Sequence, residues 1–403
     1  MKHIVFVIGN YKNGGVARRS TNIANELAEK GYIVTLLATG KISEEVFFKL
    51  EKNVEVVSLS DYITANSNNK SLIKNRNKRI RIIKLYKLLQ IMFSSSSKIK
   101  NKLNGKVREI RRSEEIDDYL SFNQAYCFIP FGIGLYEKVF YAANKRGIKV
   151  IYAEKNAPEL ELPSDEAVRK EIISHLKKAN TLVLQTEDEA GFYKKHGVEN
   201  TFVIHNPIKA NLPLPFEGGR KHIVTNFCRI SEQKNLPLLF DAFERLHNDY
   251  PDYILEIYGN TVEEREERLR DSLIESLNKT GRNEYIKILP PCADVHERIR
   301  DYAMFVSSSD FEGLSNSMIE AMAIGMPCVC TDCLGGGARE MIEDGENGLL
   351  VPMNDAEALY KAMKRFADDK ELSDICSENA ARIKDEMSAE KIAERWIEVI
   401  ERV

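Results

Sequence analysis

Residues 307–329 read SSSDFEGLSNSMIEAMAIGMPCV and place a turn and a helix between two apolar stretches. The preceding run, AMFVSSSD, has the pattern of a buried strand that leaves the core. Gly325 followed by Pro327 is typical of a helix end. Glu312 stands in the turn, and Glu320 stands in the second turn of the helix. This strand, turn and helix in succession predict an α/β protein whose ligands bind beyond the carboxyl ends of parallel strands.

The composition limits the class of protein. A chain of 403 residues is too long for one ordinary core and favours two domains. The 43% hydrophobic and 30% charged residues are typical of a soluble globular protein. No uncharged apolar run reaches about 18 residues, so no membrane-spanning helix is expected. The apolar run near the N-terminus is shorter than that of a secretory signal, and we expect a cytoplasmic protein.

Short apolar runs alternate with helix-length amphipathic stretches along the chain, which predicts parallel sheets covered by helices. The series starts with a strand at residues 3–8 and restarts at His222. Residues 206–220, between the two series, are rich in proline and glycine, as linkers are. We therefore expect two doubly wound domains, 1–205 and 221–385, that face each other across a cleft.

The C-terminal segment, residues 386–403, predicts one more helix. Its apolar residues, with the only tryptophan, Trp396, near the middle, fall on about one face. Two placements remain open. The helix either crosses to the first domain or packs on the second.

The seven cysteines are an odd number and lie mostly in or beside apolar runs, which indicates reduced, buried thiols. Cys328, Cys330 and Cys333 form a C-x-C-x-x-C pattern that raises a metal hypothesis. No second Cys/His pair stands at zinc spacing, and PCVCTD has the pattern of a buried strand. We expect no metal site and no cofactor.

Two loops at strand ends carry residues suited to phosphate. Arg229 follows the strand that starts at His222, and Lys234 precedes a helix, so that the two cations suit a diphosphate. In the first domain, Gly14 and Gly15 lie between strand and helix, where glycine lets backbone approach a ligand closely. A structural turn and a pair of solvated cations are the alternative interpretations of these two features.

The turn in 307–329 adds a further anion site and two carboxylates. With Ser315 or Asn316 as N-cap, the first N–H groups of the helix are available to a phosphate. Carboxylates beside a phosphate would repel it, so Glu312 and Glu320 are better suited to accept hydrogen bonds from hydroxyls. Phosphate and hydroxyl groups together indicate a nucleotide-sugar.

These motifs resemble those of a known family. Glu312-x7-Glu320 within EGLSNSMIEAMA, the Arg229 and Lys234 of RISEQKN and the Gly14-Gly15 pair are similar to the retaining, GT-B-fold glycosyltransferases of group 1, or family four. The VIHNPI segment, the GGGAREMIEDGENGLLVP loop and the terminal helix also match in position. The resemblance thus implies two Rossmann-like domains over nearly the whole chain.

The resemblance also implies roles for these residues. Arg229 and Lys234 would hold the donor diphosphate together with the turn from Gly313 through Leu314 and Ser315 to Asn316. Glu312 would contact the transferred sugar, Glu320 the ribose, and Gly14 and Gly15 would admit the donor phosphates. Glu312, Arg229 and Lys234 would carry the reaction. The resemblance thus implies a retaining, metal-independent hexosyltransferase that uses a nucleotide-sugar, and we expect this donor to be a UDP-sugar.

The acceptor side is less defined. Relatives often carry a histidine in the loop after the fourth strand, and residues 128–138 contain none. Glu154, Lys155 and Asn156 could face the acceptor, or form a solvated loop. A nucleotide-sugar epimerase, with His205 as its nearest acid/base group, and a non-catalytic partner subunit stay as alternatives.

A basic insert interrupts the first domain at residues 70–112. It contains fifteen Lys and Arg against one acid, Glu109, so its formal charge is about +14. Residues 77–93 alternate cations with apolar side chains, which favours an anionic membrane surface, and no nucleic-acid motif accompanies them. A saccharide or lipid-linked saccharide acceptor for surface polysaccharide, at the inner face of the cell membrane, fits this reading. A solvated helix pair is the alternative.

Overall fold

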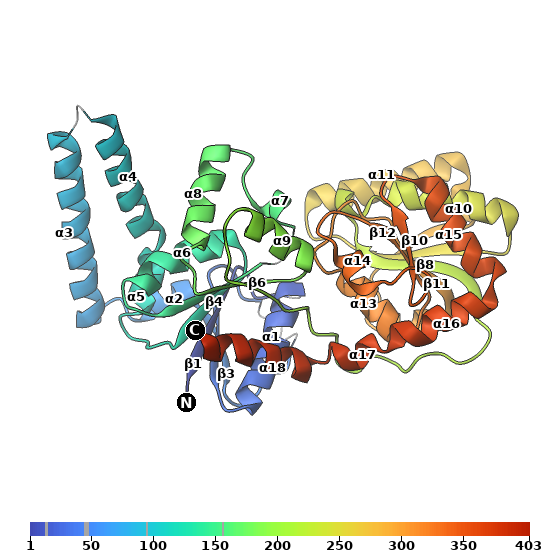
Figure 1. Ribbon diagram of the computed structural model, residues 1–403, viewed down its shortest axis with the longest axis horizontal. Coiled ribbons are helices and arrows are strands. Elements are labelled where there is room, and N and C mark those ends of the chain that lie inside the picture. The colour runs from blue at the N-terminus through green and yellow to red at the C-terminus, as the bar shows by residue number, and fades with distance from the viewer. Residues whose placement is uncertain (13–14, 44–47, 94–95, 155–156) are drawn as a thin grey trace.

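The computed structural model describes residues 1–12, 15–43, 48–93, 96–154 and 157–403. It consists of two α/β domains that lie one after the other along the long axis of the molecule (Figure 1). Each domain contains one parallel sheet with helices on both faces, which confirms the predicted fold class. Among the described residues, no helix is long and apolar enough to cross a membrane.

The sheet of the first domain has the strand order β3-β2-β1-β4-β5-β6-β7. Ile4 of β1 pairs with Val34 on one side and with Cys127 on the other, so the strand order reverses between β1 and β4. Both faces of β1 are buried because helices cover both, which explains its continuous apolar run. The strands are β1 (His3–Ile8), β2 (Ile33–Ala38), β3 (Val54–Ser58), β4 (Cys127–Pro130), β5 (Lys149–Ala153), β6 (Thr181–Leu184) and β7 (Thr201–Val203).

The first-domain helices connect these strands, apart from α3 and α4, which form a hairpin that projects from the domain (Figure 1). Thr186 caps α9, since its hydroxyl accepts a hydrogen bond from the Glu189 N–H. The helices are α1 (Gly15–Glu29), α2 (Leu59–Ala65), α3 (Lys70–Met92), α4 (Ser97–Arg112), α5 (Glu114–Tyr119), α6 (Ile133–Asn144), α7 (Pro158–Glu161), α8 (Glu166–Leu176) and α9 (Glu187–Lys195).

The sheet of the second domain has the order β10-β9-β8-β11-β12-β13 and reverses between β8 and β11. Its strands are β8 (Lys221–Arg229), β9 (Ile254–Asn260), β10 (Ile286–Leu289), β11 (Tyr302–Ser307), β12 (Cys328–Asp332) and β13 (Leu349–Pro352). Its helices are η1 (Glu232–Lys234), α10 (Leu236–Asp249), α11 (Glu264–Thr280), η2 (Arg282–Glu284), α12 (Val295–Ile299), α13 (Asn316–Ala323), α14 (Gly337–Met341), α15 (Ala356–Asp368), α16 (Lys370–Ala381) and α17 (Ile383–Glu386).

The chain joins the two domains twice. Residues 204–220 contain no helix or strand and lead from β7 to β8. The last helix, α18 (Ala389–Arg402), returns to the first domain and packs beside α1 (Figure 1). Trp396 is buried there, with its ring centroid 6.2 Å from that of Phe6 and 6.3 Å from that of Phe131. Of the two placements left open by the sequence, the structure therefore has the one that crosses to the first domain.

Candidate active site

A cleft with a volume of about 720 Å³ lies between the domains, beyond the carboxyl ends of β1 and β8. Doubly wound sheets bind ligands at such points, where the strand order reverses. Every donor-binding residue predicted from the sequence and described by the structure lines this cleft: Gly15, Arg229, Lys234, Glu312, Gly313, Leu314, Ser315, Asn316 and Glu320. Gly14 lies outside the described residues.

The two predicted cations stand at the end of β8. Lys234 in η1 forms an ion pair with Glu312, and both side chains are largely buried. Burial would lower the pKa of Lys234, but the charge of Glu312 outweighs it and the pKa is raised. Arg229 is about half exposed, with its Nε 3.3 Å from the buried Glu266 carboxylate. The Lys234 ammonium is therefore held in place by Glu312. The Arg229 guanidinium lines the cleft and is exposed enough to donate hydrogen bonds to an anion.

The turn before α13 is held by backbone contacts. Glu312 also accepts a hydrogen bond of 3.0 Å from the Ser309 hydroxyl. Gly335 and Gly337 pack against the backbone of this turn, since a Cβ at either would lie 2.0 Å or less from the Glu312 or Gly313 carbonyl oxygen. Only glycine fits there, and Gly335 also has a φ of +91°. The close packing of Gly335 and Gly337 thus fixes the position of the Glu312 backbone at the cleft.

The start of α13 meets the first domain. Ser315 is the N-cap, as one of the two predicted options, and its hydroxyl accepts from the Met318 N–H. The Leu314 N–H, expected to serve a phosphate, donates instead to Gln185 of the first domain at 3.0 Å. Beyond it, the N–H groups of Asn316 and Ser317 have no partner within the helix by geometry, and both residues line the cleft.

Glu320 is clamped from both domains. Arg18 of α1 donates to its Oε1 at 2.6 Å, and His296 of α12 lies 2.8 Å from its Oε2. Burial would raise the pKa of Glu320, but the His296 hydrogen bond and the Arg18 charge outweigh it, so the pKa lies below its ordinary value. Glu320 is therefore a carboxylate with strong acceptor capacity, suited to hydroxyl groups once Arg18 is displaced.

His296, Arg18 and Arg19 also line the cleft and were not predicted from the sequence. His296 also packs edge-on against Phe227, with ring centroids 5.3 Å apart. Together with Pro291, Cys292 and Val295 it lines the cleft beyond β10. A polar residue soon after a strand end, as in PPCADVHERI, is the signal that could have indicated it.

The first domain contributes a part-buried cation. Arg19 stacks on the Phe131 ring, 4.7 Å from its centroid, at the carboxyl end of β4. It donates to the Asn206 side-chain oxygen at 2.6 Å, and its Nε has no hydrogen-bond partner among the described residues. Burial lowers the pKa of Arg19 to about 10, so it stays charged at neutral pH. Arg19 lies beside residues 128–138, the loop in which this chain has no histidine.

Asn206 connects this cation to the second domain. Its amide nitrogen donates to the Asn316 side chain at 3.2 Å, and its oxygen also accepts from Gln185 at 3.3 Å. Gly15 approaches from the same side, because a Cβ there would lie 3.3 Å from the Asn316 amide nitrogen. The starts of α1 and α13 are thus nearly in contact across the cleft.

Among the residues that the structure describes, the predicted acceptor-side Glu154 does not line the cleft. The Glu154 side chain is buried and accepts hydrogen bonds from Tyr152 and, at 3.1 Å, from Tyr193. The apolar surroundings of β5 and its tyrosine neighbours turn this carboxylate inward, away from solvent. Lys155 and Asn156 lie outside the described residues.

The other two sequence hypotheses can be placed as well. His205 lies 3.2 Å from Glu340 and does not line the cleft among the described residues, so an epimerase loses its nearest acid/base group. Cys328, Cys330 and Cys333 are buried, and burial raises the pKa of Cys333 to about 12. In the described part of the chain, no group of three or more His, Cys, Asp or Glu side chains is placed to hold a metal ion.

Two doubly wound domains that face each other across a cleft form the architecture of the GT-B fold. Residues 215–383 match the family model described as glycosyl transferases group 1. A Haemophilus influenzae protein described as an uncharacterized glycosyltransferase is 25% identical over 98% of this chain and 99% of its own length. The family model thus covers the second domain and the end of the linker, which is less than half of the chain.

Two further matches concern polymer glycosylation and the fold. The poly(ribitol-phosphate) alpha-N-acetylglucosaminyltransferase of Staphylococcus aureus is 25% identical over 66% of this chain, and the match spans 53% of that protein. The crystal structure of a mutant of TarM from S. aureus, in complex with Fondaparinux, alpha-GlcNAc-glycerol and UDP, has a TM-score of 0.74 at 16% identity. That alignment covers 99% of this chain and 100% of TarM, and it shows the shared fold.

Proposed function

We propose that the protein is a retaining, metal-independent hexosyltransferase that transfers a sugar from a UDP-sugar to a saccharide acceptor in surface polysaccharide synthesis: capsule, exopolysaccharide or O-antigen. The observation that carries this proposal is the convergence of Arg229, Lys234, Glu312 and Glu320 on one cleft with the start of α13. Each group suits a different part of a nucleotide-sugar. A cleft for an uncharged saccharide alone would not need the two cations.

The chemistry of transfer explains the placement of charge. As the bond between the anomeric carbon and the diphosphate breaks, negative charge grows on the leaving oxygen. Arg229 and the N–H groups at the start of α13 would stabilise that charge in the transition state, which lowers the barrier. Lys234 would do the same, while its pairing with Glu312 keeps it in position.

The carboxylates would position the donor. Glu312 lies beside Arg229 and Lys234, the cations that would bind the diphosphate. From there it would accept hydrogen bonds from hydroxyls of the transferred sugar. Glu320, between α1 and α12, would accept hydrogen bonds from the ribose. UDP in the TarM complex supports a uridine nucleotide for this chain.

Retention would follow from attack on the same face. The acceptor oxygen forms its bond to the anomeric carbon on the side from which the diphosphate leaves. The acceptor proton passes to the departing phosphate oxygen, so that no carboxylate nucleophile is required. The described residues of the cleft fit this route, because both glutamates are already held in ion pairs.

The acceptor is proposed to be a lipid-linked saccharide, with the enzyme at the inner face of the membrane. A relative from Staphylococcus aureus is named as acting on poly(ribitol-phosphate), and a relative from Bacillus subtilis is named putative glycosyltransferase EpsD. These names support a polymer of the cell surface as the acceptor class. The +14 charge of residues 70–112 supports a site of action near anionic lipid.

The test is a panel of nucleotide-sugars with the purified protein in EDTA, with and without a crude lipid-linked saccharide fraction. Release of nucleoside diphosphate identifies the donor, and the anomeric configuration of the product by NMR tests retention. Lys234→Ala is expected to lower kcat/KM by roughly 10²- to 10³-fold, as for loss of one charge-stabilising donor. Glu320→Gln is expected to raise KM for the donor.

Matched controls come from an exposed ion pair on α11. Lys279→Ala and Glu275→Gln change the same residue types in the second domain and are expected to leave release unchanged. Unchanged release in Lys234→Ala would contradict the site assignment. Activity that is abolished by EDTA and restored by a divalent cation would contradict the metal-independent mechanism, and an inverted product would contradict retention.

A further inference from the structure

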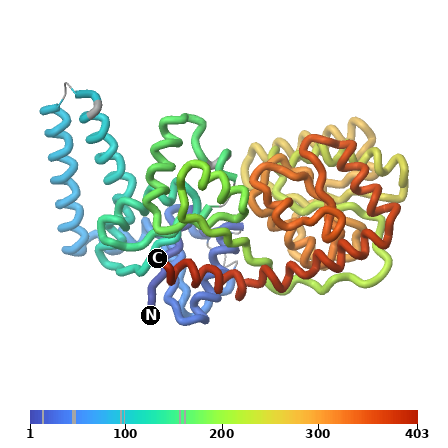
Figure 2. The backbone as a smooth tube through the Cα atoms, in the orientation of Figure 1, coloured from blue at the N-terminus to red at the C-terminus, as the bar shows by residue number. Residues whose placement is uncertain are grey.

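The α3/α4 hairpin, residues 70–93 and 96–112, lies at the end of the first domain that faces away from the second domain (Figure 2). In this hairpin α4 packs on α6 of the domain, while α3 packs on α4 and on the short helix α5. The α3 helix is therefore the outermost layer of the molecule at this end. With 23 residues it is roughly 35 Å long.

The outward surface of α3 is apolar and basic at once. Eight of the sixteen large hydrophobic side chains that are exposed among the described residues lie in this hairpin, which is about a tenth of the chain. Ile91 and Met92 are both 72% exposed, and Leu88 is 58% exposed. Lys84 and Lys87 are exposed between them, and α3 contains no acidic residue. A water-facing helix would not be expected to expose so many apolar side chains in one place.

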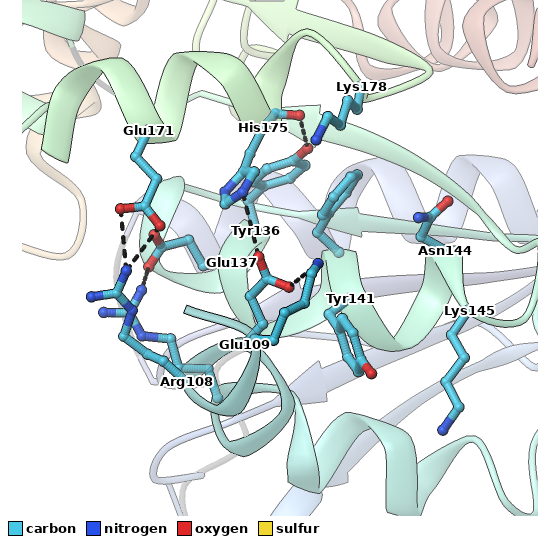
Figure 3. A pocket seen from close by; sticks show the side chains of 13 residues that line it. Arg108, Glu109, Tyr136, Glu137, Tyr141, Asn144, Lys145, Glu171, His175 and Lys178 are labelled. Carbon is cyan, nitrogen blue, oxygen red and sulfur yellow. Dashed lines mark hydrogen bonds and ion pairs between the residues drawn. The ribbon is translucent and has the colours of Figure 1, made fainter. Parts of the chain in front are cut away.

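The hairpin is fixed to the domain by its opposite side. Arg79 of α3 is buried and bonds to Asp118 at 2.9 Å and to Asp117 at 3.2 Å, both in α5. The α4 helix is held by ion pairs around a cavity of about 270 Å³ that it shares with α6 and α8 (Figure 3). There Arg108 donates to Glu171 at 2.9 Å, and Glu109 lies 3.7 Å from His175. The exposed face is thus presented in a set orientation.

We infer that the outward face of α3, through Leu85, Leu88, Ile91, Met92 and Phe93, docks into the surface of an anionic lipid bilayer. The apolar side chains would enter the interface, and the flanking lysines and arginines would reach the headgroups with their long side chains. Arg79 and the ion pairs of α4 would then hold the first domain at a fixed height over the membrane.

Charge decides against a second copy as the occupant of this face. Two hairpins packed face to face would bring together about 30 positive charges with two acids to offset them, from fifteen cations and one acid in each, so the net charge would be about +28. A nucleic acid would satisfy the cations but would leave the isoleucine and leucine side chains in contact with phosphates and water. An anionic bilayer accommodates both kinds of side chain.

The proposed membrane contact extends the proposed function. It rests on that function only in one respect, the lipid-linked acceptor. The cleft lies on the opposite side of the first domain from the hairpin (Figure 1), so such an acceptor has to extend past that domain. Vesicle binding is measured without donor or acceptor, and nucleoside diphosphate release is measured without vesicles. A failure to bind vesicles would therefore leave the proposed transferase function untouched, and a failure to release nucleoside diphosphate would leave the membrane contact untouched.

The experiment is co-sedimentation of the whole protein with vesicles of phosphatidylcholine alone or with one third phosphatidylglycerol. The wild type is expected to bind the anionic vesicles at least tenfold more tightly. Leu88→Ser/Ile91→Ser/Met92→Ser is expected to lower that binding at least tenfold. Lys84→Gln/Lys87→Gln is expected to lower it about fivefold per charge, and both variants should retain nucleoside diphosphate release.

The control is Ile375→Ser, which removes an exposed apolar side chain from α16 of the second domain, away from the hairpin. This variant should bind vesicles as the wild type does. Equal sedimentation of the wild type and the triple Ser variant would overturn the inference. Binding that ignores phosphatidylglycerol content would overturn it as well. So would a dimer of the wild type, by light scattering, that the triple Ser variant loses, because a second copy would then occupy this face.

Discussion

The two domains build their sides of the cleft in different ways. In the second domain, most of the proposed donor ligands come from two short stretches, 229–234 and 312–320. The first begins at the last residue of β8, and the second follows the end of β11 by five residues. In the first domain, Arg18, Gln185 and Asn206 come from a helix, a strand end and the linker. Each of these three bonds to a residue of the second domain. A side built from contiguous loops depends on local structure, whereas one assembled from distant segments depends on the packing of the whole chain.

The strongest test of this difference is Trp396→Ala in α18. The substitution leaves a large cavity between Phe6 and Phe131 and is expected to lower the free energy of unfolding by about 3–5 kcal/mol. Because the tryptophan lies in the first-domain core, hydrogen exchange should accelerate in β1 and β4 and not in β8 and β11. Ile375→Ala, on the surface of the second domain, is the matched control. Equal acceleration in both sheets would contradict the asymmetry.

The next largest effect is expected from Asn206→Ala. Asn206 is buried and bonds to Arg19, Gln185 and Asn316, so its loss leaves buried polar groups without partners. Each unsatisfied group costs about 1–3 kcal/mol, and we expect a total near 2–3 kcal/mol in denaturant unfolding. UDP binding by calorimetry should also weaken, since the domains lose their link at the cleft. Asn278→Ala, at an exposed position of α11, should change neither measurement.

The sequence predicted the sheets well, for a physical reason. Strands buried on both faces appear as continuous apolar runs, so β1 was predicted at residues 3–8, the bounds that the structure has. The edge strand β13 was missed, because only Leu349 and Val351 of its four residues are buried and the run is short. The helices α16 and α17 were not predicted either.

The site divides in the same way. Arg229, Lys234 and Glu312 could be predicted because each follows a recognisable strand within a few residues. Arg18 could not, since its partner Glu320 is 302 positions away and only the folded chain brings them together. For Glu154 the sequence left open an acceptor-facing position or a solvated loop. Its burial beneath two tyrosines depends on helix α9, which the local sequence does not show.

A pH measurement sharpens the description of the first domain. Burial raises the pKa of Glu189 to about 8, above its ordinary value of 4.5, with Glu154 adding to the effect and Arg19 opposing it. The folded state therefore holds a proton that the unfolded chain releases above pH 4.5. This stabilisation is complete below that pH and is lost as the pH rises through about 8.

We expect the free energy of unfolding to fall by about 2–3 kcal/mol between pH 6 and pH 9 from this group alone. Glu189→Gln keeps an acceptor for the Gln185 N–H, which now donates at 2.7 Å, and should remove most of that dependence. Urea unfolding at several pH values measures the slope. A slope that is unchanged in Glu189→Gln would show that the carboxylate is ionised in the folded protein. Glu187→Gln, in the exposed first turn of α9, is the control.

The smallest expected effect concerns the contact that joins the two sides. Arg18 and His296 occupy both oxygens of Glu320, so a ribose hydroxyl has to displace Arg18 before Glu320 can accept its hydrogen bond. The pair is part-exposed, with 29% of the Arg18 side chain accessible, and such pairs contribute about 1 kcal/mol or less. Arg18→Ala is therefore expected to tighten UDP binding roughly three- to fivefold by calorimetry, whereas Arg18→Lys keeps the charge and should change it less. Weaker binding in Arg18→Ala would mean that the guanidinium moves to the diphosphate when the cleft is filled. The first domain would then supply a donor ligand of its own, and the second domain would no longer hold the donor alone.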